Sequence, residues 1–78
     1  MNFGKALEAL KDDLPVAREG WNGKGIFLGL QVPDEHSQMT QPYIYIDTTG
    51  LQNNNAKGLV PWLASQTDML ANDWTLVL

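Results

Sequence analysis

The sequence contains no cysteine and a single histidine, His36, among its 78 residues. The lack of cysteine excludes disulfides and thiolate metal sites, and it fits a protein that works in a reducing cytoplasm. One histidine among scattered carboxylates matches none of the spacings that bind zinc or calcium, so we expect no metal site. His36 lies in the polar segment PDEHS, without the neighbouring nucleophile or glycine elbow that nucleophilic catalysis uses. We therefore expect no catalytic residue and no cofactor.

Basic residues and long apolar stretches are also scarce. Five Lys and Arg residues stand against nine Asp and Glu residues, which gives a net charge of -4. Binding to a nucleic-acid duplex depends on neutralising several phosphates, so a DNA or RNA polymer is not an expected partner. No apolar stretch approaches the roughly 20 residues that cross a bilayer, and the first residues lack the pattern of a secretory signal. We expect a soluble, cytoplasmic protein without a membrane partner.

Residues 1–78 are expected to form a single domain. A chain of this length buries only about 60 to 65% of the surface that its unfolded state exposes, so its core is marginal. Small domains gain support from disulfides, metals or partner subunits. Because disulfides are excluded, association between copies of the chain is expected.

Hydrophobic periodicity predicts a helix near the start of the chain. Phe3, Leu7 and Leu10 recur at helical spacing, and Asn2 is a candidate N-cap. Pro15 indicates that the helix ends at about residues 11–13. The Asn-Gly pair at 22–23 then predicts a hairpin with strands at about 16–21 and 24–32. A two-residue turn would pair Ala17 with Leu28 and Trp21 with Lys24, and would place Arg18 and Phe27 on the opposite face. A three-residue loop would instead turn one strand over.

The rest of the chain predicts further strands and a second helix. Residues 33–42 are polar and bracketed by prolines, which indicates a loop, and the alternation in YIYID predicts a half-buried strand at 43–47. LVPW is expected to be a short extended piece, Ser65 to cap a helix over roughly 66–72, and WTLVL to form the last strand. The predicted fold class is α+β: a small antiparallel β-sheet with an N-terminal helix and a short helix before the last strand.

Three tryptophans have both a structural and a binding interpretation. Burial of an indole is a large share of a small core, and Trp74, between helix and strand, is the most core-like. Trp21 stands beside a tight turn and Trp62 just ahead of a helix, positions that also suit stacking on a planar base. Arg18 and Lys24 flank Trp21 and would suit a phosphate, or they are ordinary solvated residues at a strand edge.

The segment ASQTD has two interpretations as well. Ser65 as an N-cap with Asp68 three residues later would simply start a helix. The same helix start, with Gln66, could offer donors to phosphate or ribose oxygens. Asp68 disfavours a phosphate there and better suits a base amine or ribose hydroxyl. Asp68 and Asp73 could act as a hydrolytic pair only if their separation in space allowed it.

Four segments resemble those of a family of small phage and prophage proteins that includes the second type of anti-Thoeris protein: MNFGKALEALK, VAREGWNGKG, PYIYI and VPWLASQTDMLANDW. The resemblance runs from Met1 to Val77, and the last segment and the Gly-Trp-Asn-Gly turn are its most specific parts. It implies a sponge that sequesters, without cleaving it, the glycocyclic ADP-ribose signal of bacterial Thoeris defence. Some relatives also bind cyclic oligonucleotides. It further implies a homo-oligomer, typically a tetramer, with the ligand held between subunits.

Together, the residues and the resemblance favour a homo-oligomeric binding protein of the host bacterial cytoplasm whose partner is a cyclic nucleotide signal. Trp21 or Phe3 would stack on a base. The polar groups of the ligand would be held by residues from both ends of the chain: Arg18, Asn22, Lys24, Ser65, Gln66, Asp68 and Asp73. The alternatives are a phage structural or interaction module, in which the tryptophans serve only core and subunit contacts, and a small nucleotide-degrading enzyme.

Overall fold

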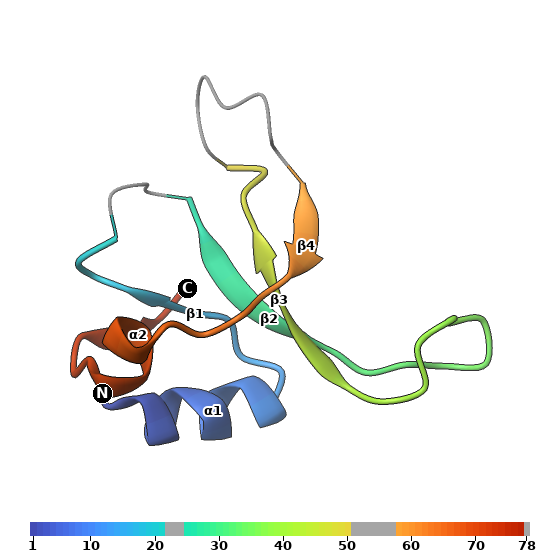
Figure 1. Ribbon diagram of the computed structural model, residues 1–78, viewed down its shortest axis with the longest axis horizontal. Helices are drawn as coiled ribbons and strands as arrows, with labels where there is room; N and C mark the ends of the chain where they lie inside the picture. Colours follow the sequence, from blue (N-terminus) through green and yellow to red (C-terminus); the bar gives the residue numbers. More distant parts are fainter. Residues whose placement is uncertain (22–24, 51–57, 78) are drawn as a thin grey trace.

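The computed structural model describes residues 1–21, 25–50 and 58–77, which form one antiparallel sheet with two helices (Figure 1). Within this part of the chain the strands follow the order β4-β3-β2-β1-β5, and each neighbouring pair is antiparallel. The predicted α+β fold is therefore confirmed. The elements in chain order are α1 (Phe3–Lys11), β1 (Val16–Arg18), β2 (Phe27–Gln31), β3 (Tyr43–Asp47), β4 (Leu59–Pro61), α2 (Gln66–Leu70) and β5 (Trp74–Leu76).

Helix α1 begins and ends as its sequence predicts. The Asn2 side chain accepts a hydrogen bond from the Lys5 backbone N–H at 2.9 Å, which satisfies one of the free donors of the first turn. The helix ends at Lys11, and Asp13 follows with a φ of 63°, a left-handed conformation that breaks the helix before Pro15. No helix among the described residues has the length and hydropathy to span a bilayer.

The core lies between α1 and one face of the sheet. The strand alternation YIYID puts Ile44 and Ile46 on the same face as Leu28 and Leu30, their register partners in β2. These isoleucines are partly buried against the core. The buried hydrophobic side chains among the described residues come from α1 and from strands β1, β2 and β5: Ala6, Ala9, Leu10, Val16, Leu28 and Trp74.

The predicted register between the first two strands is wrong by one residue. Val16, and not Ala17, lies opposite Leu28. A shift of one residue turns a strand over, so Val16 enters the core and Arg18 shares the face that carries Leu28 instead of the face that carries Phe27. Burial of the branched Val16 side chain, which also pairs with Leu76 of β5, favours this register over burial of an alanine.

Other boundaries differ in length more than in kind. Strands β1 and β2 are shorter than the predicted ranges 16–21 and 24–32, and α2 ends at Leu70 rather than near residue 72. The extended piece at 59–61 is a true strand, β4, at the edge of the sheet. The loop at 33–42 is confirmed and projects away from the helices (Figure 1). The Asn-Gly turn, with Lys24, and most of the predicted LQNNNAKG loop lie outside the described residues.

Strand β5 runs beside β1, so the last strand of the described chain is hydrogen-bonded to the first. Arg18 lies opposite Trp74, and Ala17 lies opposite Thr75. This pairing brings the residue before β5, Asp73, to the end of β1. It also brings α2, which ends at Leu70, shortly before Asp73, to the same end of the sheet. Two distant parts of the chain therefore meet there.

Candidate functional site

Arg18 is the centre of a charged cluster at the end of β1. Its Nε donates to Asp73 Oδ1 at 2.8 Å, and its Nη1 donates to Asp68 Oδ1, also at 2.8 Å. The Arg18 side chain is only 17% exposed. Because Arg18 shares the face that carries Leu28 and Trp74, its side chain can reach both α2 and the residue before β5. These three residues are called the Arg18 cluster below.

Asp68 also connects the cluster to the start of α2 and to Trp21. Its Oδ1 accepts a bond from the Trp21 indole N–H at 3.4 Å, and its Oδ2 accepts one from the Ser65 hydroxyl at 2.9 Å. The Asp68 backbone N–H donates in return to Ser65 Oγ at 3.1 Å. The predicted Ser65 cap is therefore confirmed, and the two residues form a reciprocal pair resembling a capping box.

Asp73 fixes the chain that follows β1. Its Oδ2 accepts a hydrogen bond from the Gly20 backbone N–H at 2.9 Å, and its backbone carbonyl accepts one from Glu19 N–H at 3.0 Å. The Trp21 backbone N–H donates to the Arg18 carbonyl at 3.2 Å. Residues 19–21 are thus held to the cluster by three backbone donors.

The cluster shifts the pKa values of its members toward their charged forms. The hydrogen bond from Arg18 lowers the pKa of Asp73, and the bond to Asp73 raises the pKa of the Arg18 guanidinium. Burial acts to raise the pKa of Asp68, but hydrogen bonds from Arg18, Ser65 and Trp21 outweigh it and leave this pKa below its ordinary value. Both carboxylates are therefore ionised at neutral pH, and the three side chains together carry a formal excess of one negative charge.

These lowered pKa values bear on the possibility of a hydrolytic carboxylate pair. A general acid at neutral pH needs a raised pKa, which lets the carboxyl group hold a proton to donate. Asp68 and Asp73 instead bind one guanidinium as carboxylates. Their arrangement suits a charged structural cluster better than acid catalysis. Among the described residues, no group of three or more His, Cys, Asp and Glu side chains could hold a metal ion.

Aromatic rings pack beside the cluster. Trp74 is 2% exposed, as expected for the most core-like tryptophan, and its indole N–H donates to the Asp68 backbone carbonyl at 2.9 Å. Trp21 meets Trp74 edge-on, with ring centroids 5.4 Å apart and an interplanar angle of 78°. Phe3 packs on the ring of Trp74 at 5.4 Å and on that of Trp62 at 6.1 Å. Such contacts fix the ring orientations as well as burying them.

A hollow of about 360 Å³ opens near the end of β1. Its walls are Ala17, Arg18, Glu19, Trp21, Gly25, Ile26, Phe27 and Val77, so Arg18 is the member of the Arg18 cluster that lines it. Ligand pockets commonly have volumes of about 300 to 1,000 Å³. The hollow therefore has room for part of a nucleotide, such as a base or a ribose, at the low end of this range. Trp21 and Phe27 are the aromatic residues among its walls.

Comparison with known proteins identifies the family. The family model for the Thoeris anti-defense 2-like domain matches residues 1–77. The chain belongs to this family. A curated relative, Thoeris anti-defense 2 of Bacillus phage SP01, is 36% identical over 86 residues, which span 99% of this chain and 94% of that protein. The family resemblance found in the sequence is therefore confirmed over nearly its whole length, and with it the assignment to anti-Thoeris phage proteins.

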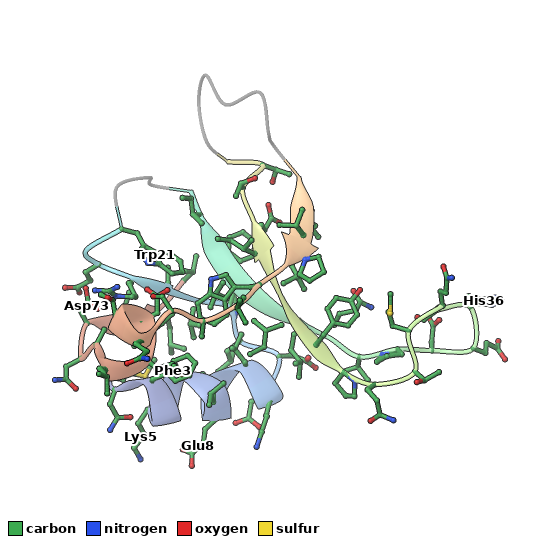
Figure 2. The ribbon with its side chains drawn as sticks, in the orientation of Figure 1. Phe3, Lys5, Glu8, Trp21, His36 and Asp73 are labelled. Atoms are coloured by element: carbon green, nitrogen blue, oxygen red, sulfur yellow. The ribbon has the colours of Figure 1, made fainter. Side chains whose placement is uncertain are left out.

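The fold of this anti-Thoeris family member gathers several of the residues predicted for its site. They come from two regions some 50 residues apart and meet in and around the Arg18 cluster: Arg18, Trp21, Ser65, Asp68 and Asp73. Figure 2 shows Trp21 and Asp73 at the same end of the molecule, with His36 at the far tip of the loop.

The remaining predicted residues are placed differently. Gln66 is exposed at the first position of α2, next to Ser65. Phe3 lies against Trp62 and Trp74 and makes the aromatic contacts of a core residue. Asn22 and Lys24 lie outside the described residues.

Sequence analysis missed two participants. Gly20 contributes a backbone N–H, for which no side-chain signal exists in the sequence. Trp74 donates its indole N–H to the Asp68 backbone carbonyl. The sequence indicates only a core role for this residue. The buried indole could have suggested this contact, because a buried Trp N–H normally finds an acceptor.

Proposed function

We propose that this protein is an anti-defence sponge of the infected bacterial cytoplasm. It binds a cyclic ADP-ribose-type signalling nucleotide, the glycocyclic ADP-ribose of Thoeris defence, and sequesters it without cleavage. Cyclic oligonucleotides are a second ligand class within the same function. The observation that carries the proposal is the convergence of Trp21, Ser65 and the Arg18 cluster at one end of the sheet, in a chain of the anti-Thoeris family. Arg18 and Trp21 also line the hollow.

The chemistry of the Arg18 cluster and its neighbours supports binding rather than turnover. Trp21 offers a ring for a base, while Gln66 and the carboxylates offer polar contacts to ribose or amine groups. Sequestration requires neither a nucleophile nor a general acid, and the ionised carboxylates of Asp68 and Asp73 fit that requirement. Asn22, Lys24 and Phe3 remain candidates for further contacts.

A homo-oligomer, and specifically a tetramer, is part of the proposal. A sponge must bind tightly enough to compete with the host sensor, which favours enclosure of the ligand between subunits. The hollow is small for a whole cyclic nucleotide, so a second subunit would complete it. Large apolar side chains near α2 offer a contact surface: Leu63 is 91% exposed and Leu70 is 77% exposed.

A depletion and release experiment tests the proposal. The protein is incubated with glycocyclic ADP-ribose or a cyclic oligonucleotide, the free nucleotide is measured, and the protein is then denatured by heat. Depletion followed by release of the intact nucleotide is the expected result. Release of an altered nucleotide would indicate an enzyme. No depletion across the panel would favour a phage structural or interaction module.

Trp21→Ala provides the matching variant, with His36→Ala as its control. We expect Trp21→Ala to abolish capture while the oligomer, measured by light scattering, persists. His36 lies on the exposed loop, far from Trp21, and its loss should leave capture unchanged (Figure 2). Full capture by an oligomeric Trp21→Ala protein would remove Trp21 from the site.

A further inference from the structure

Arg18 is the basic residue among the walls of the hollow, so the simplest role for its guanidinium would be to bind a phosphate of the ligand. Its contacts argue otherwise. Two carboxylates already lie at 2.8 Å from Nε and Nη1, so the positive charge is outnumbered where it stands. A phosphate approaching Arg18 would meet the charges of Asp68 and Asp73 at almost the same distance. The cluster as a whole repels an anion and favours hydrogen-bond donors.

The same contacts show what Arg18 does for its surroundings. The Arg18 side chain donates to the Asp68 carboxylate, which accepts the Trp21 indole N–H. The Arg18 backbone carbonyl accepts the Trp21 backbone N–H. The Arg18 side chain also donates to the Asp73 carboxylate, which accepts the Gly20 backbone N–H. Arg18 is thus connected to the ring and the backbone of Trp21, one of the residues that line the hollow.

We infer that Arg18 is a positioning residue that fixes Trp21 through Asp68 and Asp73, and that the ligand meets this cluster with ribose hydroxyl or base amine groups, not with phosphate. This inference rests on the proposed function, because it concerns the same hollow. It assigns the phosphates of the ligand to groups outside the Arg18 cluster. The two contacts are made from different nitrogens of the planar guanidinium, Nε and Nη1, and a lysine, whose donors all sit on one nitrogen, does not reproduce them.

A double-mutant cycle separates positioning from phosphate binding. Affinity for glycocyclic ADP-ribose is measured by calorimetry for Arg18→Gln, Asp73→Asn and the double variant. Positioning predicts that both single variants lose affinity, by about tenfold or more, and that the double variant is little worse than either. If Asp73→Asn binds as well as the parent or better while Arg18→Gln alone loses affinity, Arg18 is a phosphate ligand and the inference is overturned.

Arg18→Lys adds a conservative variant that keeps the charge. A phosphate contact would survive in large part, because lysine also binds phosphate as a point charge. A positioning role would be lost, so Arg18→Lys should bind about as weakly as Arg18→Gln. The affinity of the parent and of Arg18→Gln should also fall equally between low and high salt. A shallower salt dependence in Arg18→Gln than in the parent would contradict the inference, since it marks a lost phosphate contact.

A readout without ligand keeps this inference distinct from the proposed function. The indole N–H resonances of ¹⁵N-labelled protein report the hydrogen bond from Trp21 to Asp68. We expect Arg18→Gln and Asp73→Asn each to shift the Trp21 resonance while leaving that of Trp62 in place. If the parent binds no nucleotide, the proposed function fails while this shift still tests the network. An unchanged Trp21 resonance in both variants would overturn the positioning role, whatever the ligand.

Discussion

Ser65→Ala tests whether the start of α2 serves the fold. The substitution removes the hydroxyl that accepts the Asp68 N–H at 3.1 Å and donates to Asp68 Oδ2 at 2.9 Å. Loss of an N-cap serine costs about 1 kcal/mol of stability. A domain of this size has an unfolding entropy of roughly 0.16 kcal/mol/K, so this loss lowers the midpoint of thermal unfolding by about 6 °C. Ser65→Thr retains a capping hydroxyl and should lose much less.

The assay is thermal unfolding followed by circular dichroism, with nucleotide capture measured separately well below the midpoint. Protein concentration must be equal in all samples, because subunit association makes the midpoint depend on concentration. A drop of less than about 2 °C in Ser65→Ala would refute the stabilising cap. Loss of capture at a temperature where the variant is still folded would show that the hydroxyl also contacts the ligand.

Three further changes test the core, the sheet and the charged cluster. Trp74→Ala should lose about 3–5 kcal/mol, a large part of the roughly 4–12 kcal/mol available to a chain of this length, and urea unfolding should show a correspondingly lower midpoint. Gly29→Ala would place a Cβ 2.9 Å from Tyr45 Cε1, so it should cost about 1–3 kcal/mol in the same assay, a loss that Tyr45→Ala relieves in the double variant. Because the pKa values of Asp68 and Asp73 are lowered in the folded protein, their contribution to stability is present above their ordinary value of 3.8 and is lost as the pH falls through the lowered values. Acid titration of Asp73→Asn should therefore show a smaller loss of stability below that pH than the parent shows.

Much of the local structure follows from short-range patterns. The spacing of Phe3, Leu7 and Leu10 and the Asn2 cap were enough to predict α1, because these signals act within one or two helical turns. The alternation at 43–47 predicted β3 for the same reason. Ser65 was recognised as a cap from the residue three positions later. Each of these predictions depends on neighbours in sequence, where the physics is local.

The register of the first two strands was not predictable in the same way. An Asn-Gly pair indicates a tight turn, but the number of residues in the connection decides which face each side chain takes. The register depends on whether Val16 or Ala17 is buried, and it also depends on the pairing of β1 with β5. No local signal announces that the last strand will lie beside the first. The error mattered for function, because it placed Arg18 on the wrong face.

That face decides what Arg18 can do. From the sequence alone, Arg18 is either a phosphate partner beside an aromatic residue or an ordinary solvated residue at a strand edge, while Asp68 and Asp73 lie some 50 residues away. The pairing of β5 with β1 brings both carboxylates to the guanidinium, so three of the predicted residues meet, and the charge of Arg18 is outnumbered by the two carboxylates. In the proposed complex the cluster orients Trp21, and the negative charge of the nucleotide meets other groups. Arg18→Lys, which keeps the charge and loses the bridge, is the substitution that separates these two roles most directly.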